Sequence, residues 1–417
     1  RSGEYEGLKK KINGNDWKPD FGKEFNKKSG ATAIGVRDFL IAYNINLNTK
    51  STRLANAIAF DVREKGRIKR DGHPVIGEIV YDKDGNPESI PGSLKHVKAI
   101  GWYIEEFGIA QISMNLTNIT ETPIHIVFEE VVKKANARGA SVTGSELVGL
   151  IPLKSMIDAG KYFLKKQNRS VGIPEEDIIK IAVESLGLNQ VKTFDPTKNI
   201  IEYYLDKITN KNGRLIDLST RSFSDEVSRE TPAPGGGSVS SYVGALGTSL
   251  AGMVANLSCN TRGWENKVEI FSEKAHEINL LREKLLSLVD EDAHSFNSIM
   301  EAYKLPNDSD ENKKIRSKAI KVATLYAAQI PLNIMIESYT SYNIIEFLAN
   351  EGNQNSLSDS GVACLCVHTA IHGAYLNVRI NLKDVSGGDD IMKKADKILK
   401  DSHLKKEKIM KLVEDKL

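Results

Sequence analysis

Cysteine is scarce in this chain, and neither sign of charge is in excess. The 417 residues include three cysteines, Cys259, Cys364 and Cys366. So few thiols, in an odd number, exclude a disulfide framework and favour a reducing compartment, so we expect a cytoplasmic protein. The formal net charge of +2 excludes a global field that would attract nucleic acid or an anionic membrane. An anionic ligand must therefore be held by local groups.

Long uninterrupted apolar runs are also lacking. The first residues, RSGEYEGLKKKING, are polar, so no secretory signal is predicted there. The least polar stretch, Val239 to Leu257, is interrupted by Ser, Thr, Gly and Asn residues. This composition predicts a buried helix rather than a membrane span.

The first half of the chain alternates two kinds of periodicity. From Phe39 to about Leu205, strand-like runs alternate with helix-like runs, which predicts α/β layers of sheet and helices. A polar insertion between Lys69 and Pro91 contains Asp84-Gly85-Asn86, the signature of a tight turn, and is predicted to be a surface hairpin.

The second half has a different character. Beyond Asp225 nearly every segment has helical spacing, which predicts an all-α helical bundle. A chain of this length is too long for one core, so we expect a multidomain protein. The predicted divisions are an N-terminal segment 1–37, an α/β part 38–206, a polar linker 207–222 and the helical part 223–417.

Consecutive glycines mark the start of the predicted helical part. Gly235, Gly236 and Gly237 precede Ser238, the predicted N-cap of a helix rich in Gly, Ala and Ser. Flexible backbone at a helix N-terminus can direct N–H groups at an anion such as a glutamate tail. The alternative is a tight turn followed by close contact between helices. The two interpretations are compatible.

An acidic residue lies beside an apolar helical stripe in LLSLVDEDAHSFNSIM. Asp292 lies one turn after Leu288 and one turn before Phe296, so it lies on or beside the buried face. Asp290 and Glu291 point elsewhere. Such a carboxylate is either a core group satisfied by a partner or a catalytic acid–base with a raised pKa.

Two histidines have the spacing of metal ligands. His368 and His372 are four residues apart and so face one side of a helix. No Glu lies between them as in a zincin, and no third ligand is evident, so we predict a role in core contacts or hydrogen bonding and no metal. Cys364 and Cys366 are predicted core residues.

Polar side chains gather before another predicted helix, namely Asn353, Asn355, Ser358 and Asp359. Ser358 or Asp359 as an N-cap is a sufficient structural explanation. The alternative is that these groups bind the polar edge of a ring.

A basic loop near the start of the chain carries Lys23, Lys27 and Lys28. Its charges alone favour a solvated loop over a clamp for a ligand carboxylate.

Ten short segments, taken in order, resemble the formiminotransferase–cyclodeaminase family. Those similar to the second half of its transferase domain are GEYEGL, WKPDFG, SGAT, RDFLIAYNINL, AIGWYIEE, AQISMNLTN and GSELVGLIPLK. Those similar to its cyclodeaminase domain are APGGGSV, LVDEDAHSF and GAYLNVRINLKDV. Each segment alone is weak evidence of a relationship. Because all ten occur in the family's order over essentially the whole chain, together they argue against a chance resemblance.

The resemblance implies a bifunctional, folate-dependent enzyme of histidine degradation. In this family a formimino group passes from formiminoglutamate to N5 of tetrahydrofolate, leaving glutamate. The second domain then closes the ring, because N10 attacks the amidine carbon and ammonia leaves, giving 5,10-methenyltetrahydrofolate. The implied co-substrate is tetrahydrofolate, with or without a polyglutamate tail. The implied assembly is a homo-oligomer, since these enzymes form rings of dimers.

The resemblance also assigns residues. The family's catalytic Asp is the second one of a D-x-D-A motif, which falls on Asp292. Glu146, in GSELVG, occupies a pterin-contacting position. The folate-contacting segment, one residue shorter here, matches Gly22, Lys23, Glu24, Phe25, Asn26, Lys27, Lys28, Ser29 and Gly30. The cyclodeaminase pocket is expected to include Gly235, Gly236, Gly237, Ser238, Asn353 and Asp359.

One departure from the family concerns its transferase base, a His of the N-terminal subdomain. None of the eight histidines lies in its motif. We therefore expect segment 1–37 to be the remnant of that subdomain, the transferase domain to be incomplete, and this chain alone to have little or no transferase activity.

Two alternatives to the cyclodeaminase remain from the sequence. One is a folate- or polyglutamate-binding module without turnover, which would bind folate saturably but form no methenyltetrahydrofolate. The other is a methenyltetrahydrofolate cyclohydrolase built on the same helical domain. Ammonia release and methenyl hydrolysis distinguish the two enzymes.

Overall fold

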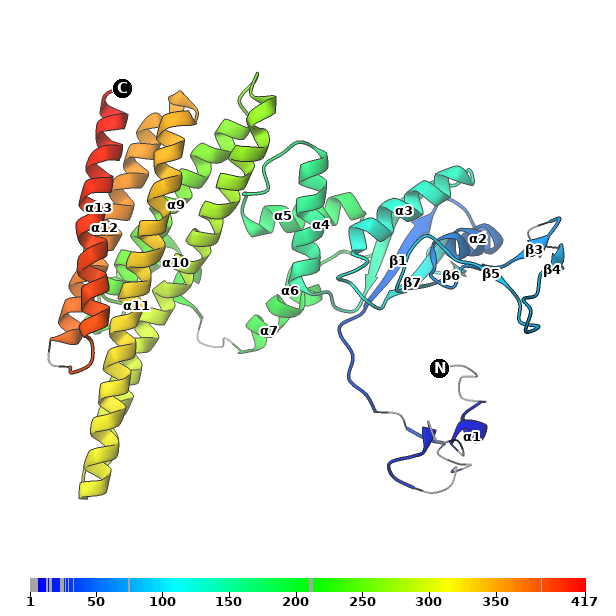
Figure 1. Cartoon of the computed structure of the whole chain (residues 1–417), viewed down its shortest axis with the longest axis horizontal. Helices are drawn as coiled ribbons and strands as arrows, with labels where there is room; N and C mark the ends of the chain where they lie inside the picture. Colours follow the sequence, from blue (N-terminus) through cyan, green and yellow to red (C-terminus); the bar gives the residue numbers. More distant parts are fainter. Residues whose placement is uncertain are drawn as a thin grey trace. The chain divides into compact units, whose positions relative to one another are not determined.

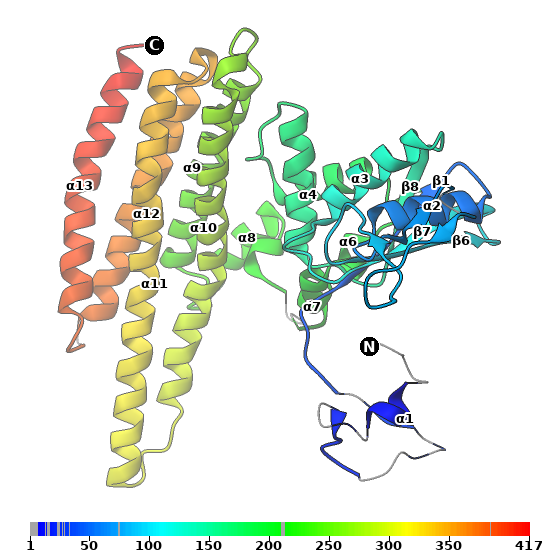
Figure 2. The ribbon, with the colours of Figure 1, turned by 45° about the vertical axis from the view of Figure 1, so that its right-hand side comes forward.

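A computed structural model of the chain describes residues 7–12, 14, 17–22, 26, 28, 30–32, 34–73, 76–209, 213–383 and 385–417. The chain divides into two compact units, Arg1–Leu40 and Ile41–Leu417 (Figures 1 and 2). The first unit contains the short helix α1 (Leu8–Lys11) and an antiparallel bridge between Asn26 and Gly30.

The second unit begins with a four-stranded sheet in the order β6-β7-β1-β8. Its strands are β1 (Ile41–Leu47), β6 (Val97–Ile104), β7 (Ile109–Leu116) and β8 (Val142–Val148). All neighbouring pairs in this sheet are antiparallel. The turn between β6 and β7 contains Gly108 with a φ of +64°, a left-handed conformation that suits glycine. The predicted layering of sheet and helices is therefore present, as an antiparallel sheet.

Helices α2 (Thr52–Val62) and α3 (Ile124–Ala137) cover one face of this sheet. Because side chains alternate along a strand, Tyr43 and Ile45 of β1 point into that layer and are fully buried. The helical spacing of Ile126, Val127, Val131 and Ala135 predicts that these four residues share the buried face of α3. The prediction was wrong at Ile126, which is 38% exposed. Ile124 faces the core instead.

Four further helices follow β8: α4 (Leu153–Lys166), α5 (Glu175–Leu186), α6 (Pro196–Asn199) and α7 (Ile201–Thr209). The sequence predicts a helix from Leu153 to about Lys166, and α4 has these bounds. α5 begins after Pro174 with three acidic residues in its first turn, which complement the helix dipole. It ends at Gly187 with a φ of +63°.

The insertion between α2 and β6 contains short strand pairs. These are β2 (Arg67–Ile68) with β5 (Ser89–Ile90), and β3 (Arg70–Asp71) with β4 (Glu78–Ile79). The turn lies where it was predicted, because the N–H of Asp82 donates to the carbonyl of Asn86 and Gly85 has a φ of +78°. The insertion therefore contains two short ladders rather than a single hairpin.

The C-terminal part of the second unit is helical (Figure 2). Its long helices are α9 (Gly236–Cys259), α10 (Val268–Tyr303), α11 (Asp310–Glu351), α12 (Leu357–Leu382) and α13 (Asp389–Glu414). Shorter elements are η2 (Leu215–Asp217), α8 (Thr220–Val227), η3 (Glu265–Lys267) and η4 (Gln354–Ser356). The apolar side chains of the five long helices share a second core. The sequence predicts helix breaks at residues 232–237, 306–308 and 352–358, and breaks lie there; those between α9 and α10 and between α12 and α13 were not predicted.

Small residues bring α9 close to α12. A Cβ on Gly373 of α12 would lie 2.3 Å from the hydroxyl oxygen of Ser240, and one on Gly247 would lie 2.9 Å from Cβ of Cys366. The Gly- and Ala-rich composition of α9 therefore serves helix contacts within the bundle.

Two segments, α11 and Gln354–Leu382, are long and apolar enough to cross a membrane by length and composition alone. In each, 44% of the most apolar window is buried inside the bundle. Core helices of a bundle have the same composition, because they bury apolar side chains on several sides.

Glycine substitutions test the helix contacts. Gly160→Ala in α4 should destabilise the fold, because the new Cβ would lie 2.2 Å from the backbone oxygen of Ile178 in α5. The gain in helix propensity is about 1 kcal/mol, whereas overpacking costs about 1–3 kcal/mol or more. Gly252→Ala in α9 is the control, since its nearest contact is 3.5 Å. It should raise the denaturant midpoint, and a higher midpoint for Gly160→Ala would contradict this account.

Candidate functional site

Asp292 of α10 lies against the first turn of α9. The Ser238 hydroxyl is 3.0 Å from the Asp292 Oδ2 atom, and the Ser238 backbone N–H also donates to this carboxylate. A Cβ on Gly237 would lie 2.1 Å from the Asp292 Oδ1 atom. The carboxylate therefore occupies space that any side chain at position 237 would fill.

Ser238 is not the N-cap that the sequence predicted. The helix begins at Gly236, and its N-cap is Gly235 in an extended conformation. Ser238 therefore lies within the first turn, where its single hydroxyl proton has two acceptors, the Val289 carbonyl at 2.9 Å and the Asp292 carboxylate. The serine thus anchors α9 to α10 as well as holding the acid.

Burial dominates the electrostatics of Asp292. Desolvation raises the pKa of this carboxyl above its ordinary value, and the two hydrogen bonds from Ser238 oppose that rise. The side chain is partly, not fully, removed from solvent. A half-buried carboxyl with a raised pKa is a stronger base than an exposed one, which suits acid–base chemistry.

The neighbouring acids have other partners. Asp290 accepts a hydrogen bond from the Leu215 N–H at 2.6 Å, and Glu291 accepts one from the Tyr326 hydroxyl at 2.7 Å. These contacts agree with the expectation that Asp292 alone of the three faces α9.

Asn377 of α12 also lies at the first turn of α9. Its Nδ2 atom would be 3.2 Å from a Cβ on Gly236, and it donates to the Gly373 carbonyl at 2.9 Å. A polar amide and a carboxylate thus lie beside the glycine-bearing turn. Gly235, Gly236, Gly237 and Ser238 lie at this end of the bundle.

Asn353 and Asp359 do not share this location, so the predicted pocket was wrong for them. The Asn353 N–H donates to the Ser258 hydroxyl, near the opposite end of α9. Twenty residues of α-helix separate Ser238 from Ser258, which is a rise of about 30 Å. α12 runs antiparallel to α9, so the residues at its start lie far from Asp292. The N-cap of α12 is Ser356 rather than Ser358 or Asp359.

A second polar site lies on the sheet face that points away from α2 and α3. In the paired strands, Asn44 of β1 lies beside Glu146 of β8. The Glu146 Oε2 atom accepts hydrogen bonds from Asn44 at 3.1 Å and from Gln111 at 3.3 Å. The predicted pterin-contacting carboxylate is therefore fixed by two amides.

The row of amides continues across the sheet. Asn46 accepts from the Gln111 Nε2 atom at 2.7 Å and donates to the Gln190 Oε1 atom at 2.7 Å. The Gln111 Oε1 atom is buried without a hydrogen-bond partner among the described residues. Trp102 pairs with Gln111 on the same face and is 44% exposed. The face therefore offers a carboxylate, amides and an aromatic ring, which suit a flat, polar-edged heterocycle.

Sequence inspection missed Asn44, Asn46 and Gln111. The signal was present in FLIAYNINL, because Asn44 and Asn46 are two residues apart and so share one face of an otherwise apolar strand. Gln111 is found only from the strand register.

The predicted folate-contacting segment is partly described. Lys23, Glu24, Phe25, Lys27 and Ser29 lie outside the described residues. Around them, the Gly30 N–H donates to the Asn26 carbonyl at 2.7 Å, and the Lys28 N–H donates to the Asn26 side chain at 2.9 Å. Gly22 and Gly30 have φ values of +81° and +68°, so this segment turns at both glycines.

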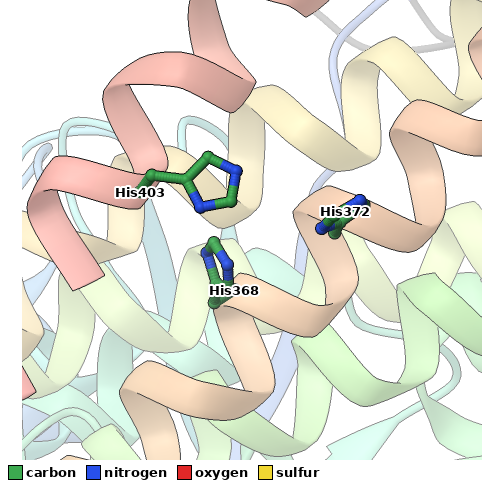
Figure 3. A group of neighbouring side chains, drawn as sticks. All are labelled: His368, His372 and His403. Atoms are coloured by element: carbon green, nitrogen blue, oxygen red, sulfur yellow. The ribbon is translucent and has the colours of Figure 1, made fainter. Parts of the chain in front are cut away.

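The two spaced histidines have a third neighbour that the sequence did not reveal. His403 of α13 points toward His368 and His372 of α12 (Figure 3). Among the described residues, these three can place ligand atoms within 4.8 Å of one another. His403 is therefore a third candidate ligand, which was not evident from the sequence. Of the predicted core thiols, Cys364 is buried and Cys366 is partly exposed.

Family comparisons divide the chain into two regions. The "Formiminotransferase domain" family model matches residues 42–206, and the "Formiminotransferase-cyclodeaminase" model matches residues 219–400. The transferase domain is therefore recognised in this chain. The predictions of a missing N-terminal subdomain, an incomplete transferase domain and absent transferase activity have no support here.

Relatives extend over nearly the whole chain. Formimidoyltransferase-cyclodeaminase of Gallus gallus is 38% identical over 387 residues, which are 93% of this chain and 68% of the relative. The Dictyostelium discoideum protein of the same name is 37% identical over 421 residues, covering 100% of this chain and 73% of the relative. Methenyltetrahydrofolate cyclohydrolase of Methylorubrum extorquens is 29% identical over 198 residues, covering 47% of this chain and 95% of the relative.

The raised pKa of Asp292 predicts how stability changes with pH. The folded state holds this proton more tightly than the unfolded state, so ionisation above the raised pKa disfavours folding. Each unit of raised pKa corresponds to about 1.4 kcal/mol. Asp292→Asn removes this penalty, so the variant should unfold at an equal or higher temperature than the parent near neutral pH.

Thermal unfolding of both proteins, followed from acid to neutral pH, checks this. The unfolding temperature of Asp292→Asn should exceed that of the parent by a margin that grows as pH rises. Glu291→Gln, one position away, is the control for the loss of a carboxylate in this helix. A parent chain that is more stable than Asp292→Asn at neutral pH, by a margin growing with pH, would mean that the folded state favours the ionised acid.

Proposed function

Because the chain belongs to the formimidoyltransferase-cyclodeaminase family, we propose that its helical part closes the ring of 5-formiminotetrahydrofolate. The products are ammonia and 5,10-methenyltetrahydrofolate. The observation that carries the proposal is the half-buried carboxyl of Asp292, held against a helix turn whose glycine leaves room for it.

The proposed step needs one group that both accepts and donates a proton. N10 of the folate attacks the carbon of the protonated amidine, and the N10 proton passes to Asp292. The same proton then passes to the departing nitrogen, the C–N bond breaks, and neutral ammonia leaves. The positive charge of the amidinium stays on the methenyl product, so the enzyme ends the step in its starting state.

The environment of Asp292 suits this shuttle. An ordinary aspartate is too weak a base to take a proton from an attacking amine, and desolvation makes it stronger. The two donors of Ser238 keep the ionised form accessible. Asn377 and the turn at Gly236 supply polar groups beside the carboxylate that can orient the folate.

For residues 42–206 we propose tetrahydrofolate binding on the open sheet face. The pterin ring carries adjacent N–H donors, which match the two oxygens of one carboxylate, and Glu146 offers that acceptor. Its position is fixed by Asn44 and Gln111. Trp102 provides an aromatic surface on the same face. The same folate would then receive the formimino group from formiminoglutamate, as the family name implies.

A cyclohydrolase is the second candidate, because the Methylorubrum relative aligns with this chain over 95% of its length. Methenyltetrahydrofolate is the product of cyclodeamination and the substrate of the cyclohydrolase, and only cyclodeamination releases ammonia. A folate-binding module without turnover would produce neither signal. A cytoplasmic location and a homo-oligomeric assembly, expected from the sequence, stay predictions.

Turnover of Asp292→Asn tests the catalytic assignment. With 5-formiminotetrahydrofolate as substrate, the variant should lose about 10²–10⁴-fold in kcat, measured by methenyltetrahydrofolate absorbance and by ammonia release. Glu291→Gln is the matched control and should keep the parent rate, because its carboxylate bonds to Tyr326. Parent-like turnover by Asp292→Asn would refute the assignment. Methenyl hydrolysis that exceeds ring closure in the parent would favour the cyclohydrolase.

Glu146→Gln tests the proposed pterin site. A charge-assisted hydrogen bond is worth about 1.5–3 kcal/mol. The variant should therefore bind tetrahydrofolate about 10–100-fold more weakly at the sheet site, while any binding to the helical part is unchanged. Ring closure by the helical part should be unchanged. Glu130→Gln is the control, because this acid pairs with Lys134 on α3, in the helix layer. Unchanged folate binding in Glu146→Gln would exclude the sheet face as the site.

A further inference from the structure

Three imidazoles meet between the last two helices of the bundle. His368 and His372 lie one turn apart on α12, and His403 projects from α13 toward them (Figure 3). The ring centroids of His368 and His403 are 4.9 Å apart, those of His372 and His403 are 6.0 Å apart, and those of His368 and His372 are 6.3 Å apart. Each residue can offer one nitrogen within 4.8 Å of the others.

We propose that His368, His372 and His403 bind one zinc ion or a similar late first-row divalent ion, which ties α13 to α12. The proposal is independent of the proposed function, because none of these residues lies at Asp292 or on the sheet.

The geometry needs only small adjustments. Nitrogen ligands around a tetrahedral zinc lie about 2.0–2.1 Å from the ion, and so about 3.3 Å from each other. Since these atoms lie within 4.8 Å of one another, they must approach by up to about 1.5 Å. His372 and His403 are exposed side chains, so rotation about their χ angles can supply that movement without disturbing the core.

The least exposed ligand is already oriented. The Nδ1 atom of His368 lies 3.2 Å from the hydroxyl oxygen of Tyr342, a fully buried residue of α11. With its proton on Nδ1, His368 donates to that oxygen and leaves Nε2 free for an ion. A metal-bound histidine commonly has such a partner, which fixes both its tautomer and its ring orientation.

The charges around the site select the type of ion. Lys406 of α13 lies near His368. The positive Lys406 opposes a purely electrostatic cation site. Calcium and magnesium require oxygen ligands, whereas imidazole suits zinc, copper, nickel and cobalt.

The ion would serve to hold the last helix in place. Two ligands come from α12 and one from α13, so full coordination requires that α13 be docked. Binding to the folded state alone then stabilises that state in proportion to the logarithm of ion concentration over Kd. The fourth position would be filled by water, since the site opens to solvent through His372 and His403.

Zinc titration of the full chain, freed of metal by chelation, tests the proposal. Calorimetry should give one ion per chain, and cobalt should give the visible absorption of a tetrahedral complex. Zinc should also raise the unfolding temperature by several degrees. His403→Ala should weaken zinc binding at least about tenfold and abolish the thermal shift, because only two ligands remain. Tyr342→Phe should weaken zinc binding about tenfold, because it removes the hydroxyl that orients the His368 ring.

Two controls keep the result interpretable. His276→Ala removes a histidine of α10 outside the cluster and should leave zinc affinity unchanged. Cys366→Ser removes the one partly exposed thiol, which also lies on α12, and should likewise have no effect. Equal zinc affinity in the parent and in His403→Ala, or zinc binding that depends on Cys366, would overturn the proposal. Circular dichroism of each variant confirms that the helices are intact.

Discussion

The whole helical part depends on one constraint, the seating of the Asp292 carboxylate against a turn of α9 that has no side chain at position 237. A Cβ there would overlap both carboxylate oxygens. The same turn must approach α12, where Asn377 and Gly373 lie beside Gly236 and Ser240. Glycine and serine therefore occupy the first turn of α9 because three helices meet there, and the acid gains partial burial from the same contacts. The contacts that shape this turn are thus the same ones by which α9 packs against α10 and α12.

The two polar sites are built on different principles. On the sheet, Glu146 is one acceptor in a row of amides that fix one another, so the charge is well compensated and the edge is rigid. In the bundle, the hydrogen-bond donors to Asp292 among the described residues come from Ser238, and desolvation prevails. A compensated carboxylate suits recognition of a ring with N–H donors. An uncompensated one suits proton transfer. The two kinds of site therefore lie in different parts of the chain, one on the sheet and one in the helical bundle.

Local features of the chain could be predicted from sequence, whereas features that depend on register could not. The bounds of α4, three of the helix breaks of the bundle and the position of Asp292 beside an apolar stripe follow from patterns within one segment. Ser238 was mistaken for an N-cap because Gly235 can begin the helix earlier. Asn353 was assigned to the wrong end of the bundle because the antiparallel course of α12 is not visible in sequence. Gln111 and His403 were missed for the same reason, since each meets its neighbours only through the alignment of two strands or two helices.

α12 connects the features that sequence inspection separated. His372 and Gly373 are adjacent, so their directions differ by about 100° around the helix. Gly373 meets Ser240 in α9, one turn beyond the glycines at Asp292. His372 faces His403 of α13 instead. A displacement of α12 would therefore change both the turn that receives the carboxylate and the docking of the last helix. Because a close-packed interior transmits small shifts rather than absorbing them, whatever fixes α13 on α12 also limits the positions that Gly373 and Asn377 can take beside α9.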